Sequence, residues 1–256
     1  MGYFIDIQGT LIDDVNKAAI TGAIDFIDTL NSAKIPYVLV TNNSKTDSDQ
    51  FFNYLKSVGF NCNYENYIDP LMVLQELLPA QPVAAYGDEK FLQLLVHKGY
   101  ELEYENPSAV LVGMKKDFAA TEYAQMIRLL QGGAKLVGMH ASTVYAKDGL
   151  SYPGLGAILQ MLSYATNCSY DVVGKPSELF YEKALKKIGY EDFGDVMMIS
   201  DDLVGDLVGA KEIGCKTSLV LSGKIKDPTQ LLQGLKESQK PDRIEKNIGK
   251  LIDDIR

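Results

Sequence analysis

Short apolar runs alternate with amphipathic stretches along most of this sequence of 256 residues. Residues 3–7, YFIDI, form an apolar run that stops before Gly9, which favours a buried strand ending near Asp6. From 15 to 34, apolar residues recur at steps of three and four, which predicts a helix packed on a sheet. IPYVLV at 35–40 is typical of a second strand. A strand, a helix and a strand in this order predict a right-handed parallel crossover.

The same alternation returns near the end of the chain. The expected elements are a strand at 171–175, a helix closed by Gly189, a strand at 195–200, a helix at about 204–213 and a strand at 217–221. The polar, lysine-containing stretch 222–240 is typical of a loop or a short surface helix, and a last helix follows Pro241. Together with the first stretch, this pattern predicts an α/β fold with a doubly wound parallel sheet.

A second series of strands and helices lies between these two stretches. Its strands are expected at 83–86, 109–114 and 135–139. No Pro/Ser-rich linker marks its edges, which favours an inserted domain over a tandem one. We therefore predict a core formed by 1–77 and 167–256 and an inserted α/β cap domain formed by 78–166.

Polar residues stand where the predicted strands end. Asp6 ends the first strand, Thr41 follows the second, and Lys175 and Asp201 follow two later strands. A single such residue is commonly a helix cap or a turn residue. The binding crevice of an open parallel sheet lies at the carboxyl ends of its strands. Four polar residues at such strand ends therefore predict a shared pocket.

The charge balance narrows the class of ligand. The chain has 34 acidic and 25 basic residues, a net charge of −9, and a sequence pI of about 4.8. This balance argues against a nucleic-acid backbone or an anionic membrane as partner and favours a small molecule. If that molecule is phosphorylated, a metal ion or backbone dipoles must supply positive charge.

Cysteines, histidines and the start of the chain suggest an ordinary intracellular protein. Cys62, Cys168 and Cys215 form no CxxC pair, so neither a disulfide framework nor a zinc site is indicated. His97 and His140 are too few for a histidine-rich metal site. The start resembles no signal peptide, and no segment approaches the roughly 18 apolar residues of a membrane span. We expect a soluble, cytoplasmic protein.

The acidic residues predict a metal site. Asp6, Asp201 and Asp206 would repel one another unless a cation lies among them. Hard oxygen ligands with open water positions favour Mg²⁺.

A phosphate brought to that place would meet several suitable groups. Lys175 and the metal can neutralise its oxygens, while the Thr41 hydroxyl and the backbone around Asn42 and Asn43 complete a cradle. Asp6 would attack the phosphorus atom in line and form an aspartyl-phosphate that water hydrolyses.

Four motifs in this order resemble the haloacid dehalogenase superfamily. They are Asp6-Ile7-Gln8-Gly9-Thr10, Thr41-Asn42-Asn43-Ser44, Val173-Gly174-Lys175-Pro176, and Ser200-Asp201-Asp202-Leu203-Val204-Gly205-Asp206. The large insert, the segment 151–157 and Pro241-Asp242 are similar to subfamily IIA, which includes the p-nitrophenyl phosphatases, pyridoxal phosphatase and bacterial nucleotide monophosphatases. The resemblance covers essentially the whole chain.

The resemblance implies a Mg²⁺-dependent phosphatase acting on a small phosphorylated metabolite. It implies Asp6 as nucleophile and metal ligand, the main-chain carbonyl of Gln8 and the Asp201 carboxylate as further ligands, and Asp206 as outer support. Thr41 would bind the phosphoryl group and Lys175 would stabilise it. The candidate phosphate-binding residues are Gly9, Thr10, Asn42 and Asn43. The resemblance also implies a possible homodimer through the cap.

Two sets of residues depart from the family pattern. Gln8 stands where the family has a general acid/base aspartate, so binding should survive better than catalysis, and Ser200 replaces the usual glycine. In the insert, Lys115 replaces an acid and His140 enters the expected substrate-facing loop, so both are candidate substrate contacts, and the identity of the substrate cannot be transferred.

Three other interpretations are open. A catalytically impaired protein that binds a phosphorylated metabolite, or regulates through such binding, would retain the metal and phosphate sites; Gln8 supports it. A phosphoacceptor receiver domain also gathers Asp, Thr and Lys, but its lysine comes last, whereas Lys175 precedes Asp201. A dinucleotide-binding domain would need a GxGxxG after the first strand, which the sequence lacks.

Overall fold

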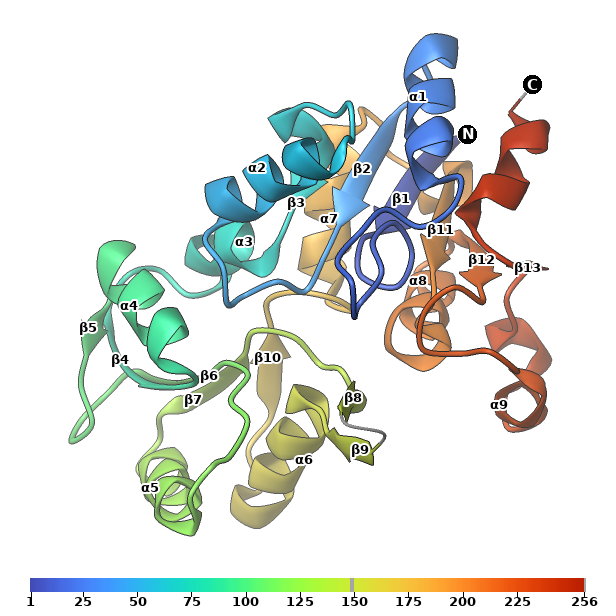
Figure 1. Cartoon of the computed structure of the whole chain (residues 1–256). Coiled ribbons are helices and arrows are strands. Elements are labelled where there is room, and N and C mark those ends of the chain that lie inside the picture. Colours follow the sequence, from blue (N-terminus) through green and yellow to red (C-terminus); the bar gives the residue numbers. More distant parts are fainter. Residues whose placement is uncertain (148–149, 256) are drawn as a thin grey trace. The chain divides into compact units, whose positions relative to one another are not determined.

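A computed structural model describes residues 1–147 and 150–255, which form two compact units (Figure 1). Of the described residues, the first unit contains 1–41, 49–68 and 181–255, and the second contains 42–48, 69–147 and 150–180. The division into a core and a cap at the boundaries given above stays a prediction.

The first unit is built on a six-stranded sheet in the order β13-β12-β11-β1-β2-β3, and every neighbouring pair is parallel. The strands are β1 (Gly2–Asp6), β2 (Tyr37–Val40), β3 (Tyr67–Ile68), β11 (Val196–Ser200), β12 (Lys216–Val220) and β13 (Arg243–Glu245). All residues of β1 are buried, as its apolar composition predicts. Figure 1 shows β1 between β2 and β11, at the centre of the sheet.

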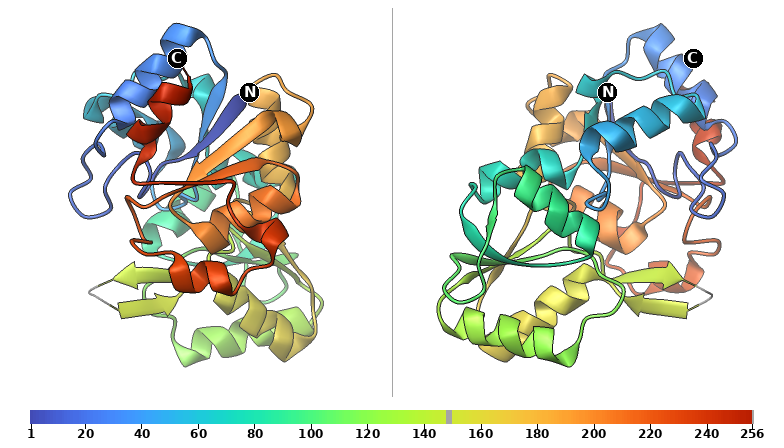
Figure 2. Two further views of the ribbon diagram at one scale, coloured as in Figure 1. Left: turned by 90° about the vertical axis from the view of Figure 1, so that its right-hand side faces the viewer. Right: turned by 60° about the vertical axis from the view of Figure 1, so that its left-hand side comes forward.

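Helices cover both faces of this sheet. The helices are α1 (Ala23–Ala33), α2 (Ser48–Val58), α7 (Glu178–Lys187), α8 (Val208–Glu212) and α9 (Thr229–Gln233), with short helical segments η1 (Tyr64–Asn66), η2 (Phe193–Asp195), η3 (Leu203–Leu207), η4 (Glu237–Gln239) and η5 (Ile248–Asp254). Figure 2 shows α1 and η5 on one face and α7 and α8 on the other. The unit is therefore doubly wound.

The first helix begins later than its periodicity predicts. The prediction placed its start at residue 15, but α1 begins at Ala23. The Asp13 carboxylate accepts hydrogen bonds from the main-chain N–H groups of Val15 and Asn16, at 2.8 and 2.7 Å, which stabilises a turn instead. Gly22 then adopts a φ of 81° immediately before the helix. Local side-chain hydrogen bonds outweigh helical periodicity here.

The second unit carries a five-stranded parallel sheet in the order β10-β7-β6-β4-β5. Its strands are β4 (Pro82–Tyr86), β5 (Glu101–Leu102), β6 (Ala109–Val112), β7 (Lys135–Gly138) and β10 (Tyr170–Val172), and an antiparallel hairpin joins β8 (Val144–Lys147) to β9 (Leu150–Pro153). Its helices are α3 (Pro70–Leu77), α4 (Glu89–His97), α5 (Ala120–Gln131) and α6 (Leu155–Thr166).

One strand assignment was wrong. The strand expected at 171–175 was placed in the first sheet, but β10 pairs with β7 of the second sheet, with Val172 opposite Gly138. The alternation of strands and helices reveals that a strand exists, but it does not reveal which sheet supplies the partner. The hairpin of β8 and β9 was not predicted either.

The core of the second unit depends on close packing of α6 against β7. Leu159 is fully buried, and a Cβ placed on Gly138 would lie 2.2 Å from its Cδ1 atom. Glycine therefore lets the helix approach the strand closely, and the leucine fills the space that this approach leaves.

We predict that Leu159→Ala lowers the free energy of unfolding by about 2–5 kcal/mol, because it leaves a cavity in a closely packed core. The measurement is urea unfolding followed by circular dichroism. Met161→Ala on the same helix is the control; its side chain is exposed, so its effect should stay below about 1 kcal/mol. Equal effects of both changes would contradict this packing.

Candidate active site

Asp6 ends the central strand and is held by a residue four positions later. The chain turns back sharply after β1, because the N–H groups of Leu11 and Ile12 both donate to the carbonyl of Ile7. This turn places the Thr10 hydroxyl 3.1 Å from Oδ2 of Asp6, to which it donates a hydrogen bond. Both side chains are buried. The loop after β1 thus fixes the predicted nucleophile.

Asp201 joins Asp6 through the same hydroxyl. Strands β1 and β11 are parallel neighbours, with Ile5 opposite Ile199, so their ends reach the same edge of the sheet. The N–H group of Asp201 donates to the Thr10 hydroxyl oxygen over 3.1 Å. One threonine therefore bridges the two strand-end aspartates.

The negative charges of Asp6 and Asp201 favour binding of a cation between them. Burial raises the pKa of Asp201 to about 8, and the Asp6 carboxylate adds to the rise, while the N–H group and ammonium of Lys224 oppose it. The two carboxylates and the main-chain carbonyl of Gln8 are hard oxygen donors, which fit a divalent ion such as Mg²⁺. In the residues that the structure describes, no three His, Cys, Asp or Glu side chains converge as a metal site.

Asp206 is held by a hydrogen bond to the end of β11. Its Oδ2 atom accepts a hydrogen bond of 2.7 Å from the Ser200 hydroxyl, which in turn accepts from the N–H group of Asp202 over 3.0 Å. The Asp202 carboxylate caps η3 by accepting from the N–H group of Gly205 at 2.8 Å. The departure at Ser200 therefore adds a hydrogen bond that orients Asp206.

Sequence reasoning missed one loop that contacts the site. The segment 222–224 follows β12, and the Ser222 hydroxyl donates to the carbonyl of Gly9 over 2.7 Å. The Lys224 N–H group donates to Oδ2 of Asp201 over 2.7 Å, and the Lys224 ammonium lies 2.5 Å from Oδ2 of Asp202. Its position after a parallel strand was the signal that could have revealed it.

Glycines allow this close approach. A Cβ on Gly9 would lie 2.3 Å from Oδ2 of Asp201, and a Cβ on Gly223 would lie 1.9 Å from the same oxygen. The Gly9 φ of 83° also favours glycine. The carboxylate of Asp201 is thus in contact with two main-chain segments.

Thr41 and Gln8 contact each other directly. The Thr41 hydroxyl is buried and donates to Oε1 of Gln8 over 2.8 Å. The first unit therefore brings together the predicted residues Asp6, Gln8, Gly9, Thr10, Thr41, Asp201 and Asp206.

Lys175 and Asn42 belong to the second unit. Lys175 follows β10, so the argument that placed it at the edge of the first sheet was wrong for this residue. Its N–H group donates to Oδ1 of Asn42 over 2.8 Å, and Nδ2 of Asn42 donates to its carbonyl over 3.4 Å. Asn42 thus holds the main chain of the lysine. Asn43 instead forms a local turn, in which its Nδ2 atom donates to the carbonyl of Thr46 over 2.7 Å.

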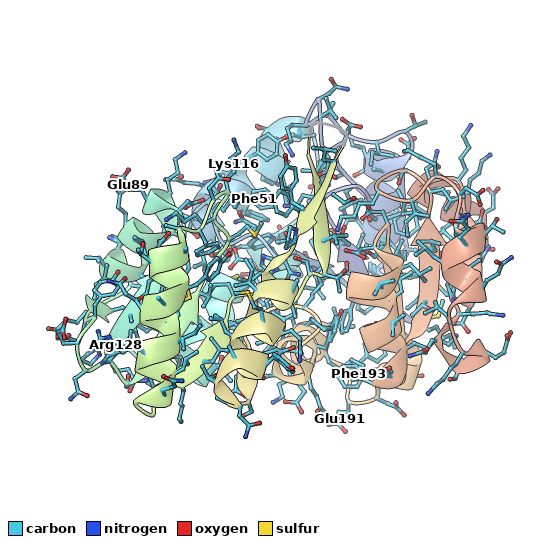
Figure 3. The ribbon with its side chains drawn as sticks, turned by 90° about the horizontal axis from the view of Figure 1, so that it is seen from below. Phe51, Glu89, Lys116, Arg128, Glu191 and Phe193 are labelled. Atoms are coloured by element: carbon cyan, nitrogen blue, oxygen red, sulfur yellow. The ribbon has the colours of Figure 1, made fainter. Side chains whose placement is uncertain are left out.

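The two candidate contacts of the insert are also in the second unit. The Lys115 ammonium lies 2.7 and 2.8 Å from the two carboxylate oxygens of Glu122, which also accepts from the N–H group of Ala119 at the start of α5. Its neighbour Lys116 is exposed (Figure 3). His140 is buried, with Nδ1 lying 3.1 Å from the Ser142 hydroxyl.

Comparisons with known proteins decide the family. The haloacid dehalogenase-like hydrolase model matches residues 3–101, and the HAD-hydrolase-like model matches residues 172–251. Human haloacid dehalogenase-like hydrolase domain-containing protein 2 is 31% identical over 222 residues, covering 86% of this chain and 83% of that protein. The chain belongs to the haloacid dehalogenase-like hydrolases.

Two further relatives agree with this family. The 5'-nucleotidase YutF of Bacillus subtilis is 26% identical over 229 residues, covering 88% of each chain. The structure of p-nitrophenyl phosphatase from Archaeoglobus fulgidus superposes with a TM-score of 0.85 at 24% identity, covering 99% of this chain and 98% of that one, and shows the same fold. The predicted family, its subgroup IIA and the α/β fold class are confirmed. In the described part of the chain, no helix is long and apolar enough to span a bilayer.

The raised pKa of Asp201 predicts a pH dependence of stability in this hydrolase without metal. The carboxyl binds its proton more tightly in the folded chain, so ionising it costs folding stability. Stability should therefore be lost as the pH rises from about 4 towards about 8. In EDTA, we expect the melting temperature to fall between pH 5.5 and 8, and to fall less in Asp201→Asn.

The control for this series is Asp195→Asn, which removes an exposed carboxylate outside the site. Melting is followed by circular dichroism in the same buffers. If Asp201→Asn and Asp195→Asn show the same slope as the native chain, burial of Asp201 is not the cause.

Proposed function

We propose that this chain is a Mg²⁺-dependent phosphatase that hydrolyses a small phosphorylated metabolite through an aspartyl-phosphate on Asp6. The chain is a phosphoric monoester hydrolase of the haloacid dehalogenase-like family. The observation that carries the mechanism is the Thr10 hydroxyl, which links the Asp6 carboxylate to the main-chain N–H group of Asp201 at the edge of the sheet.

The metal ligands would be the Asp6 and Asp201 carboxylates and the main-chain carbonyl of Gln8, with Asp206 as outer support. Bound there, Mg²⁺ supplies positive charge against the carboxylates and the phosphate oxygens. Thr10 orients Asp6 by its hydrogen bond, and Ser200 orients Asp206 in the same way. These hydrogen bonds would orient the Asp6 carboxylate for attack before the substrate binds.

The covalent step uses an oxygen of Asp6. A lone pair of that oxygen attacks phosphorus, the bond from phosphorus to the leaving oxygen breaks, and its electron pair departs with the leaving group. Water then attacks the phosphorus of the aspartyl-phosphate, which releases inorganic phosphate and restores Asp6. On substrate binding, the single hydrogen of the Thr41 hydroxyl would turn from Oε1 of Gln8 to the transferring phosphoryl group, and Lys175 would neutralise the charge of that group. The cradle would be completed by Gly9, Thr10, Asn42 and Asn43.

Gln8 limits this chemistry. In the substrate-free chain, its Oε1 atom accepts the hydrogen bond from Thr41. Its amide N–H₂ group can only donate hydrogen bonds, for example to a leaving oxygen. An amide does not titrate, so Gln8 cannot pass a proton to the leaving group or take one from water. We therefore propose attenuated turnover, since general acid–base help typically contributes about 10²- to 10⁴-fold.

The second candidate function is a catalytically impaired protein that binds a phosphorylated metabolite or regulates through such binding. The amide at Gln8 favours it, because metal and phosphate binding need no titrating group there. The test is steady-state hydrolysis of p-nitrophenyl phosphate with Mg²⁺ and with EDTA, using Asp6→Asn as control. Turnover that needs both Mg²⁺ and Asp6 supports the enzyme; Mg²⁺-dependent phosphate binding without turnover supports the binding protein.

The setting proposed for the protein is the cytoplasm, where the free thiols of Cys62, Cys168 and Cys215 would stay reduced. Nucleic acids and membranes are not proposed as partners, given the net charge of −9. A homodimer through the inserted domain is proposed as well. Exposed Val144 and Leu150 of the hairpin support it, since they offer apolar surface to a second copy.

Gln8→Asp should change turnover according to the leaving group. Alkyl phosphates need protonation of the leaving oxygen, so their kcat/KM should rise by about two to four orders of magnitude. Aryl phosphates such as p-nitrophenyl phosphate leave as stable anions and should gain less. The measurement is kcat/KM for both substrate types in both chains. Equal alkyl phosphate turnover in the two chains would mean that another group supplies the proton.

Lys115→Ala and His140→Ala should alter the preference among phosphorylated metabolites more than the hydrolysis of p-nitrophenyl phosphate. The reason is that both residues would meet only the part of the substrate that does not react. A panel of phosphorylated metabolites gives the comparison, with the exposed Lys116→Ala as control. Equal losses on every substrate would instead point to the lost Lys115–Glu122 ion pair and damaged folding.

A further inference from the structure

Lys224 contacts the acidic site in two ways. Its main-chain N–H group donates to Oδ2 of Asp201 over 2.7 Å, and its ammonium pairs with Oδ2 of Asp202 at 2.5 Å. The loop is held in place from the other side, because the Ser222 hydroxyl donates to the carbonyl of Gly9. The contacts are therefore part of the folded site rather than those of a solvated lysine.

The ammonium stands close to a concentration of negative charge. Asp6, Asp201 and Asp206 are buried, and Asp202 follows directly in the chain. Besides its contact with Asp202, Lys224 interacts electrostatically with Asp201 and Asp206. Its side chain is 38% exposed, so most of it lies against the protein. The Lys224 ammonium is therefore a positive charge supplied by the chain itself, beside the carboxylates that would bind Mg²⁺.

We propose that Lys224 is a positioning residue and a resident counter-charge of the metal site. Its N–H group orients the Asp201 carboxylate, and its ammonium holds the acidic cluster together in the metal-free chain. The same ammonium repels an incoming Mg²⁺ and weakens its binding. The inference rests on the proposed function for the identity of the metal.

The two roles can be separated by substitution. Lys224→Met keeps the main-chain N–H group and removes only the charge, whereas Lys224→Arg keeps the charge. Lys226→Met is the matched control, because Lys226 lies in the same loop and its ammonium donates to the carbonyl of Ser222. It removes one positive charge without touching the aspartates at 201 and 202.

The first experiment measures thermal unfolding of the full chain in EDTA at pH 7.5. We expect Lys224→Met to lower the melting temperature by several degrees more than Lys226→Met does, and Lys224→Arg to restore it. A melting temperature of Lys224→Met equal to that of Lys226→Met would overturn the counter-charge role. This result does not depend on whether the chain binds Mg²⁺ or hydrolyses phosphate.

The second experiment measures Mg²⁺ binding by titration calorimetry. Removing a positive charge beside the site should make Lys224→Met bind Mg²⁺ about tenfold more tightly, with Lys224→Arg and Lys226→Met close to the native chain. Unchanged or weaker binding in Lys224→Met would overturn the repulsion. A native chain that binds no Mg²⁺ would overturn the proposed function and the repulsion with it, while the EDTA series would still decide the counter-charge role.

Asp202→Asn provides an independent variant if Lys224→Met does not fold. An asparagine can still accept from the N–H group of Gly205 through its side-chain oxygen, but it removes the carboxylate that pairs directly with the Lys224 ammonium. Mg²⁺ binding should then weaken by about tenfold, the opposite direction from Lys224→Met. Unchanged affinity in Asp202→Asn would overturn the proposal.

Discussion

A single hydroxyl group connects the two halves of the acidic site. Thr10 donates to Asp6 and accepts from the N–H group of Asp201, which lies 191 positions later in the chain. The bridge is possible because β1 and β11 are parallel neighbours and end at the same level. The bridge holds the main chain of Asp201, and the Asp201 carboxylate lies so close to Gly9 and Gly223 that any side chain at either position would collide with it.

Much of the fold and part of the site could be predicted from the sequence, because they depend on local patterns. Short apolar runs placed the strands ending near Asp6 and Asp201, and the polar residue after each run marked the edge of the sheet. The partner of a strand is not a local property. For this reason the strand before Lys175 was assigned to the wrong sheet, although its existence was correctly predicted.

The contacts between distant loops could not be predicted from the sequence either. The position of residues 222–224 after a parallel strand could have placed this loop at the edge of the sheet. The contact of Lys224 with Asp201 could not be predicted, because it depends on the lengths and directions of two separate loops. In the same way, the sequence marked Lys115 as a candidate substrate contact or a surface residue, and its ion pair with Glu122 was not foreseen. Charge at a position can be read from a sequence, whereas the group that neutralises it depends on the folded chain.

The strand order has a consequence for synthesis of the chain. Strand β1 leaves the ribosome before the other strands of its sheet, and β2 can pair with one of its edges soon afterwards. Its other edge must wait for β11, which begins at Val196. Until then, the apolar residues Tyr3, Phe4 and Ile5 lie on a strand with an open edge, a known starting point for aggregation. The strand order therefore leaves one edge of β1 without its partner strand throughout synthesis of the residues between β2 and β11.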